Sequence, residues 1–270
     1  MVELDCMVES KVLIGVCHVQ QVFADFMWSL IALDKPPRTE LMPVGTKTLI
    51  DSSRNSITEA ALRGGFTHVF FMDSDQTFPP FALTRLLSRD KDIITGIYPH
   101  RSLHAEPTIY SSIDGGYKKM IEWDPNGGPF EIAACGAGCL LIRTEVLRKI
   151  GRPHFKVVNN LENNEYLGED MWFCRRAKEE GFHIFADPEV TCGHIDVIEF
   201  TIEMFMAERD RVKNFSTMVK KFPVKCEKCG HDFEDTMEGE MLHTYLFDKK
   251  NCPKLTTVCP KCNHEQEFKE

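Results

Sequence analysis

Short apolar runs recur along most of the chain, and each has the length of one strand. The run that ends at Met72, His-Val-Phe-Phe-Met, is continuous rather than alternating and is rich in residues that favour strands. A continuous apolar run is typical of a central parallel strand that is covered on both faces. Similar runs predict further strands at 12–16, 92–98 and 139–143.

Segments with helical spacing separate these runs. Residues 56–63 predict a helix, and the Gly-Gly pair that follows predicts where it ends. Glycine tolerates the left-handed conformation that is often found after a helix. Three leucines at helical spacing predict the next helix, which starts at Pro80. Further helices are predicted at 144–151 and 171–181. The alternation predicts right-handed βαβ units and an α/β, Rossmann-like fold with a mostly parallel central sheet flanked by helices.

Two stretches carry neither pattern. Residues 99–129 are rich in Gly, Pro, Ser and His, and we expect a loop with a pair of strands there. Residues 153–168 contain two Asn-Asn pairs and predict a flexible polar loop. After this loop, 182–186 and 190–194 predict a further pair of strands.

The C-terminal part of the chain has a different organisation. Apolar residues from Ile198 to Phe222 follow helical spacing and predict a linking helix whose apolar side packs on the preceding domain. We therefore expect two domains, a large α/β domain over 1–222 that ends in this helix and a small domain over 223–270.

Composition allows an enzyme-sized core and argues against some partners. The chain has 270 residues, of which 43% are hydrophobic and 27% charged, which is ordinary globular composition. A net charge of −9 counts against binding nucleic acid through non-specific phosphate contacts. No apolar run reaches the length of about 18 residues that a membrane span needs.

The cysteines and the N-terminus bear on the compartment. The chain has 11 cysteines, an odd number, and most are single residues within apolar stretches, which favours a reducing compartment over a disulfide framework. The first residues carry acids where a secretory signal would carry Lys or Arg. We expect a cytoplasmic protein, in the host cytoplasm if the chain is viral. The sequence is compatible with both a monomer and an oligomer.

The acidic triplet Asp73-Ser74-Asp75 directly follows the apolar run that ends at Met72. In open α/β sheets, ligands bind outside the carboxyl ends of such strands. Two carboxylates at this place suit Mg²⁺ or Mn²⁺, which typically takes one or two protein carboxylates and also holds substrate phosphates. The alternative is an ordinary turn, because Asp and Ser are common turn residues.

A second acidic pair, Glu169-Asp170, stands where the helix over 171–181 begins. One interpretation of Asp170 is a helix cap, because a carboxylate there accepts backbone N–H bonds and meets the positive end of the helix dipole. The other is a general base that the helix start fixes within hydrogen-bond reach of a hydroxyl. Farther on, His194 ends a predicted strand beside a glycine; it is either structural or an imidazole brought close to the metal.

Two Cys-x-x-Cys pairs mark the small C-terminal domain. Cys226 and Cys229 form the first pair, and Cys259 and Cys262 form the second. Paired knuckles of this kind supply four thiolates in tetrahedral geometry, so they predict a structural zinc ribbon. A domain this small needs such a staple to be stable. Two disulfides are the alternative, which the expected reducing compartment disfavours.

Taken in order, these segments resemble the metal-dependent glycosyltransferases of the GT-A fold, close to the large family 2 type. The resemblance covers roughly residues 11–194. It rests on the segments at 70–75, 94–98, 135–142, 168–170 and 192–194. Each segment alone is common in proteins, but the five segments in this order are specific.

The resemblance implies roles for individual residues. Asp75 corresponds to a direct metal ligand, Asp73 to a group that contacts ribose or a metal-bound water, and His194 to the third metal ligand of some members. Asp170 corresponds to the base that activates the acceptor in inverting members, with Glu169 a second catalytic candidate beside it. The implied residues of the nucleotide-sugar pocket are Arg54, Asn55, Asp73, Ser74 and Asp75, together with Gly136, Ala137 and Gly138 under the donor sugar.

The implied function is transfer of a hexosyl or pentosyl group from a nucleotide-diphosphate sugar to an acceptor hydroxyl, with inversion. A metal at the two aspartates offsets the charge that grows on the leaving diphosphate. A glycosidase, which also uses two acids, is a weaker alternative, because acids two residues apart serve a shared cation better than opposed roles. A non-catalytic protein that binds sugar nucleotides or nucleic acid is the other alternative.

The acceptor is open: glycan, lipid, protein or modified DNA. Zinc ribbons often contact nucleic acid, so a hydroxymethylated base extruded from a duplex is one hypothesis. From Pro223 onward, however, the chain has seven lysines, no arginine and ten acidic residues. For lack of a basic surface, we favour a ribbon that acts as a structural or oligomerisation module.

Overall fold

The computed structural model describes residues 10–19, 21–45, 49–102, 104–113, 117–160, 165–196, 199–216, 219–238 and 256–267. The chain forms two compact units, Met1–Phe205 and Met206–Glu270. The predicted domain limit at residue 222 stays a prediction. No helix in the described ranges is long and apolar enough to cross a membrane.

The first unit is built on a seven-stranded sheet in the order β2-β1-β3-β10-β5-β13-β8. Strands β1, β2 and β3 are parallel to one another, as are β5 and β13, whereas β10 runs antiparallel to both β3 and β5. The α/β class with a mostly parallel sheet is therefore confirmed. The strands are β1 (Lys11–His18), β2 (Arg38–Gly45), β3 (His68–Asp73), β5 (Ile93–Ile97), β8 (Phe130–Ile132), β10 (Cys139–Arg143) and β13 (Ile184–Thr191).

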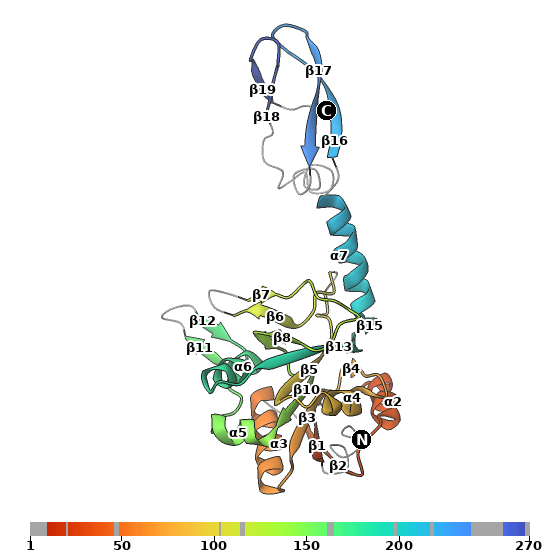
Figure 1. Ribbon diagram of the computed structural model, residues 1–270, viewed down its shortest axis with the longest axis vertical. Coiled ribbons are helices and arrows are strands. Elements are labelled where there is room, and N and C mark those ends of the chain that lie inside the picture. The colour runs from red at the N-terminus through yellow and green to blue at the C-terminus, as the bar shows by residue number, and fades with distance from the viewer. Residues whose placement is uncertain are drawn as a thin grey trace. The chain divides into compact units, whose positions relative to one another are not determined.

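Helices cover both faces of this sheet (Figure 1). On one face, α3 lies so close to β1 that a Cβ at Gly15 would stand 2.4 Å from Ile57 Cγ2. Phe70 and Phe71 of β3 point to opposite faces and are 0% and 1% exposed, so the central strand is buried on both sides, as predicted. The helices are α2 (Ala24–Ala32), α3 (Ile50–Arg63), α4 (Ala82–Ser88), α5 (Thr144–Ile150) and α6 (Glu169–Glu179).

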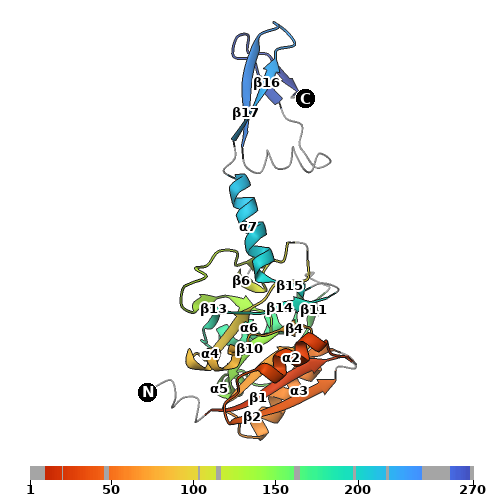
Figure 2. The same ribbon diagram turned by 90° about the vertical axis from the view of Figure 1, so that its right-hand side faces the viewer.

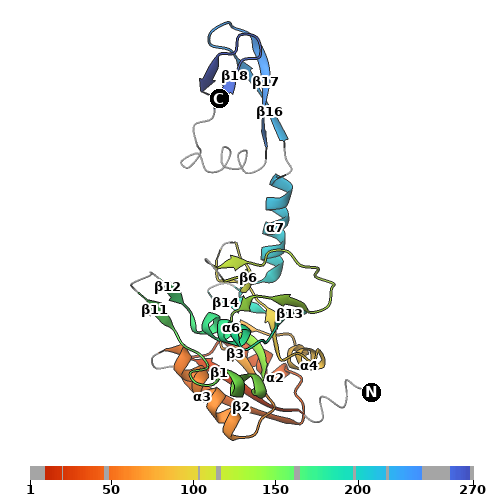
Figure 3. The same ribbon diagram turned by 60° about the vertical axis from the view of Figure 1, so that its left-hand side comes forward.

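Several elements differ from the sequence expectation. Helix α3 begins at Ile50, six positions before the expected Ser56. The stretch expected as a polar loop contains a hairpin of β11 (Val158–Asn160) and β12 (Glu165–Leu167), which lies beside α6 (Figures 1 and 3). The second Asn pair of that stretch, at 163–164, lies outside the described residues. Strands this short and polar carry no apolar run that a sequence pattern could detect.

Two small sheets complete the first unit. One joins β4 (Gln76–Thr77), β14 (Gly193–Ile195) and β15 (Glu199–Phe200). The other joins β6 (Ile109–Ser112) and β7 (Lys118–Lys119), which lie in the region 99–129 expected to hold a pair of strands, to β9 (Ala134–Cys135), which lies beyond that region. The first of these sheets matters most for the site, because it pairs the segment after Asp75 with the segment that carries His194.

The linking helix is observed as α7 (Ile202–Ser216) and is shorter than the predicted 198–222: Ile198 lies outside the described residues, and Phe222 belongs to a strand over Val219–Lys225. At its start, Phe205 is 4% exposed and stacks on Trp123, with ring centroids 5.7 Å apart. This contact lies within the first unit, so the helix begins as part of it. In its described residues, the second unit contains two hairpins, labelled in Figure 1, the first of which is also labelled in Figure 2. They are β16 (Val219–Lys225) with β17 (Asp232–Glu238), and β18 (Thr256–Val258) with β19 (Glu265–Glu267).

Candidate functional site

The acidic triplet lies at the carboxyl edge of the central sheet. Strand β3 ends at Asp73, whose backbone N–H donates to the carbonyl of Gly138 over 3.0 Å. Asp73, Ser74 and Asp75 line a cavity of about 420 Å³. The end of β1 and the start of α3 also border the cavity. Its other lining residues are Cys17, His18, Val19, Gln21, Phe23, Ile50 and Arg101.

Backbone pairing brings His194 to Asp75. Strands β14 and β4 place His194 opposite Gln76, and the N–H of Ile195 donates to the carbonyl of Asp75 over 2.7 Å. His194 Nδ1 lies 2.8 Å from the carbonyl oxygen of Pro99. A carbonyl only accepts, so Nδ1 donates a proton to it, and Nε2 is the ring nitrogen left to face Asp75. This Nε2 atom lies 3.5 Å from Asp75 Oδ2.

Arg101 meets the same carboxylate, and the sequence analysis missed it. Its Nη1 atom lies 3.3 Å from Asp75 Oδ2, and its side chain is 42% exposed. Burial acts to raise the pKa of Asp75, but His194 and Arg101 outweigh it and hold that pKa below its ordinary value. Arg101 stands four residues after the end of β5, where ligand-binding residues of parallel sheets gather, and this position was the available signal.

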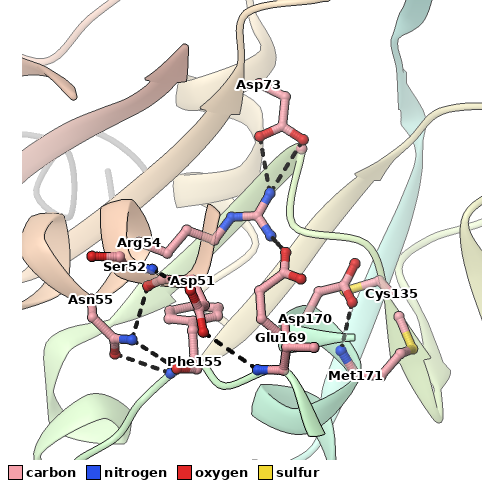
Figure 4. A network of polar contacts seen from close by, with 12 residues as sticks. Asp51, Ser52, Arg54, Asn55, Asp73, Cys135, Phe155, Glu169, Asp170 and Met171 are labelled. Atoms are coloured by element: carbon pink, nitrogen blue, oxygen red, sulfur yellow. Dashed lines mark hydrogen bonds and ion pairs between the residues drawn. The ribbon is translucent and has the colours of Figure 1, made fainter. Parts of the chain in front are cut away.

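Asp73 has a different partner. Arg54 Nη2 donates to Asp73 Oδ1 over 3.0 Å and to Oδ2 over 3.2 Å, and Arg54 Nη1 bonds to Glu169 (Figure 4). Arg54 is 2% exposed. Burial acts to lower its pKa, but the charges of Asp73 and Glu169 outweigh burial and raise it, so Arg54 keeps its charge. Arg54 thus links the two acidic motifs.

Asn55 also serves the protein backbone. Its Oδ1 accepts the N–H groups of His154 and Phe155, both over 3.1 Å, and its Nδ2 donates to the carbonyl of Phe155 over 2.7 Å. The side chain therefore fixes the loop before β11, as Figure 4 shows for Phe155. These bonds use both ends of the amide, and the predicted place of Asn55 in a nucleotide-sugar pocket stays a prediction.

Asp170 stands in the first turn of α6, one residue after Glu169 and two after the N-cap Gly168. Its Oδ1 accepts the N–H of Met171 over 2.8 Å. Burial first, and then the charge of Glu169, raise the pKa of Asp170 to about 6, while Arg54 opposes the shift. A carboxyl with a pKa near neutrality can accept a proton from a bound hydroxyl.

The predicted loop under the donor sugar packs against the triplet. A Cβ at Gly138 would stand 2.1 Å from Gln76 Nε2 and 3.0 Å from Asp73 Oδ2, so any other residue would displace the buried Gln76 side chain or the loop. At Gly136, a Cβ would stand 2.1 Å from the Tyr98 hydroxyl oxygen, which also accepts the N–H of Gly138 over 3.0 Å. Ala137 between them is 1% exposed.

The four predicted zinc ligands come together. Among the described residues, the only group of three or more metal-binding side chains within 4.8 Å of one another is Cys226, Cys229, Cys259 and Cys262. The Sγ atoms of Cys226 and Cys262 are 3.6 Å apart, and those of Cys229 and Cys259 are 3.7 Å apart. A disulfide requires about 2.05 Å, whereas sulfurs around one tetrahedral zinc lie about 3.8 Å apart. The arrangement therefore fits one zinc ion.

The two knuckles repeat one backbone pattern. In the first, the N–H of Cys226 donates to the carbonyl of His231, and in the second the N–H of Cys259 donates to the carbonyl of His264. Gly230 and Asn263 occupy the same position in each turn, with φ of 68° and 55°. Glycine and asparagine tolerate this left-handed conformation best, which explains the residue types.

The oxygen and nitrogen ligands divide into two sets. Asp75 lies with His194, and Asp73 lies with Arg54 and Glu169. In the described part of the chain, Asp73, Asp75 and His194 do not form one group within 4.8 Å. Asp75 and His194 are thus the pair placed to share an ion, and Asp73 borders the same cavity.

No protein-family model matches the sequence, and no curated protein matches it. Solved structures do match. A197 from STIV aligns with a TM-score of 0.51 at 18% identity over 69% of this chain and 86% of that chain. GalNAc-T7 with UDP, GalNAc and Mn²⁺ aligns at 0.47 and 9% identity, over 74% of this chain and 48% of that one. S. aureus TarS 1–349 with UDP-GlcNAc aligns at 0.40 and 13% identity, over 66% and 56%.

The similarity to these solved structures is a similarity of fold. The match to A197 spans most of that chain and, with the sheet order, confirms the GT-A fold that the sequence predicts for the first unit. Identities this low do not by themselves carry an activity from one protein to another.

Proposed function

We propose that this chain is a metal-dependent glycosyltransferase that moves a sugar from a nucleotide-diphosphate sugar to an acceptor hydroxyl with inversion. The observation that carries the proposal is the cavity at the carboxyl edge of the sheet. There Asp73, Ser74 and Asp75 line the wall, and His194 Nε2 lies 3.5 Å from the carboxylate of Asp75. Ligands of α/β sheets bind at this edge.

The pair Asp75 and His194 fits a divalent cation. A carboxylate oxygen and a neutral imidazole suit Mn²⁺ and are tolerated by Mg²⁺. Their separation of 3.5 Å is close to the roughly 3.0 Å between neighbouring ligands of an octahedral ion. The bond from Nδ1 to Pro99 orients the ring, as is usual for a ligating histidine. When bound, the ion offsets the negative charge that develops on the leaving diphosphate.

Asp73 has a supporting role in this proposal. Arg54 occupies both of its oxygens, so the carboxylate is oriented and its charge is partly balanced. An oriented carboxylate beside the ion suits a contact to the ribose or to a water of the ion rather than strong direct ligation.

Asp170 is the proposed base. Its raised pKa of about 6 keeps it ionised at neutral pH yet basic enough to accept the proton of an acceptor hydroxyl. The start of α6 fixes its position through the Met171 N–H. Attack on the sugar from the side opposite the diphosphate gives inversion. Gly136, Ala137 and Gly138 would lie beneath the donor sugar, where the absence of larger side chains lets the backbone approach it.

The experiment is a hydrolysis assay of UDP- and GDP-sugars with Mn²⁺, with the wild type and Asp75→Ala. We expect turnover that needs Mn²⁺ and a loss of about 100-fold or more in the variant. Turnover without a divalent ion would contradict the metal dependence, and no turnover with any donor would favour the alternative of a non-catalytic protein that binds sugar nucleotides or nucleic acid.

The acceptor and the ribbon need their own test. In the ribbon, acidic residues outnumber lysines by three, so we favour a structural or oligomerisation role over contact with DNA. An acceptor screen of glucan, lipid, peptide and hydroxymethylated DNA separates these possibilities, since only a DNA-directed ribbon predicts transfer to the modified base. A cytoplasmic location agrees with the zinc thiolates, which a reducing compartment preserves.

A further inference from the structure

Two nitrogen groups lie near one oxygen of Asp75. His194 Nε2 lies 3.5 Å from Oδ2 and Arg101 Nη1 lies 3.3 Å from the same atom. The imidazole is held from behind by Pro99, so its direction is fixed. The guanidinium stands at the end of a long side chain that is 42% exposed, so it has room to move.

A divalent ion and the guanidinium cannot both hold this oxygen well. An ion shared by Asp75 and His194 would place two positive charges within a few ångströms of the charge of Arg101. Like charges at that distance repel, and the repulsion is strongest in a partly buried cavity. Binding of the ion therefore favours departure of Arg101 from Asp75.

The cavity offers Arg101 a second partner. Arg101 lines the same cavity as Asp73, Ser74 and Asp75, where the donor's diphosphate would lie. A planar guanidinium matches the oxygens of a phosphate in a bidentate manner, which makes arginine a preferred phosphate ligand.

We propose that Arg101 binds Asp75 while the ion is absent and binds the diphosphate of the donor once the ion is present. This inference rests on the proposed function and adds to it a phosphate-binding residue with two alternative partners. Arg101 thereby balances the charge of Asp75 in the free protein and helps to hold the leaving group in the loaded one.

Arg101→Met separates the two roles, because it removes the charge and keeps much of the length. Two affinities are measured by calorimetry on the full chain: Mn²⁺ alone, and UDP at saturating Mn²⁺. We expect Mn²⁺ to bind about two- to fivefold more tightly, because its competitor is gone, and UDP to bind about tenfold or more weakly. A residue with a merely structural role would weaken both.

Arg85→Met is the matched control. Arg85 is 38% exposed and lies 3.2 Å from Glu189, so its exposure and ion pair resemble those of Arg101. We expect neither affinity to change in this variant. Arg101→Lys is the second variant: it keeps the charge but loses the bidentate geometry, so Mn²⁺ affinity should stay near the wild type while UDP affinity falls.

The outcomes separate the inference from its premise. A wild type that binds neither Mn²⁺ nor UDP contradicts the proposed function itself. A wild type that binds both, with Arg101→Met unchanged toward UDP or weaker toward Mn²⁺, overturns the role of Arg101 and leaves the proposed function standing. If Arg101→Met does not fold, Arg101→Lys provides the test instead, and wild-type UDP affinity in Arg101→Lys would overturn the inference.

Discussion

Arg54 shows how a single side chain can connect two motifs that are far apart in the sequence. It is 2% exposed and lies between Asp73 at the end of β3 and Glu169 at the start of α6. Because Glu169 adjoins Asp170, one guanidinium sets the position of both acidic motifs (Figure 4). The resemblance implies a place for this arginine in the nucleotide-sugar pocket, which stays a prediction, and the structure shows its ion pairs with the two carboxylates.

Replacing the buried Arg54 leaves two partly buried carboxylates without their partner. We expect Arg54→Met to lower the free energy of unfolding by about 3–5 kcal/mol, the usual cost of breaking a buried pair. Urea unfolding followed by tryptophan fluorescence measures it in the first unit, because the three tryptophans are Trp28, Trp123 and Trp172. The exposed control Arg85→Met should change it by at most about 0.5 kcal/mol. Equal effects of the two would contradict the buried network.

Asp170 leads to a prediction about pH. Burial and Glu169 raise its pKa from 3.8 to about 6, and only the ionised form can accept a proton. Transfer should therefore fall about tenfold per pH unit below pH 6 and stay level above it. Asp170→Asn should lower the transfer rate about 10²–10⁴-fold and keep UDP binding. The remaining rate of this variant should no longer fall below pH 6. An equal loss of UDP binding and rate would reduce Asp170 to a helix-start residue.

At the scale of elements, the site depends on how short segments pair. The sequence could predict β3 and its acidic end, because a continuous apolar run followed by carboxylates is a strong local pattern. It could not predict that β4 pairs with β14, since two-residue strands such as Gln76–Thr77 have no pattern of their own. That pairing, rather than sequence proximity, brings His194 to Asp75.

The same limit explains what was missed. Arg101 lies in a stretch read as loop, and only the tertiary structure turns it toward Asp75. Asn55 has the residue type of a ligand-binding group, yet its amide is used by the backbone of His154 and Phe155. The four cysteines were predictable because zinc ligands come in short, spaced pairs that do not depend on distant packing.

The glycine loop gives an element-scale prediction. Gly138→Ala would place a Cβ 2.1 Å from Nε2 of the buried Gln76 and 3.0 Å from Asp73 Oδ2, so the Gln76 side chain or the loop itself must shift beside Asp73. We expect UDP affinity in the presence of Mn²⁺ to fall about tenfold or more, measured by calorimetry. Gly128→Ala is the matched control, because a Cβ there meets nothing within 4 Å. Unchanged affinity in Gly138→Ala would contradict a close contact between this loop and the triplet.

The four-cysteine ribbon gives a second prediction at the scale of elements. The sulfur geometry predicts one zinc ion per chain, released when a ligand is lost. Elemental analysis of purified protein should find one zinc per wild-type chain and none in Cys259→Ser. Cys174→Ala, at a buried cysteine of α6 outside the cluster, should keep the zinc. If the wild-type protein still contains no zinc after it has been refolded with added zinc in reducing buffer, the zinc site is refuted.

At the scale of the whole molecule, two units have different sources of stability. The first unit buries a continuous apolar core around its sheet, whereas the second depends on its four thiolates. The net charge of −9 fits a protein whose anionic donor is held by a local cation site rather than by a general positive surface. The sequence therefore predicts the class of each unit well, and the arrangement of side chains in the site only in part.

The central claim is that Asp75 and His194 hold the divalent ion that binds the donor's diphosphate. The most direct measurement is anomalous scattering from manganese in crystals grown with Mn²⁺ and a sugar nucleotide. We predict one peak within bonding distance of Asp75 and His194 Nε2 and in contact with both phosphates. A bound nucleotide with no manganese at this edge of the sheet, or manganese bound elsewhere in the first unit, would contradict the account.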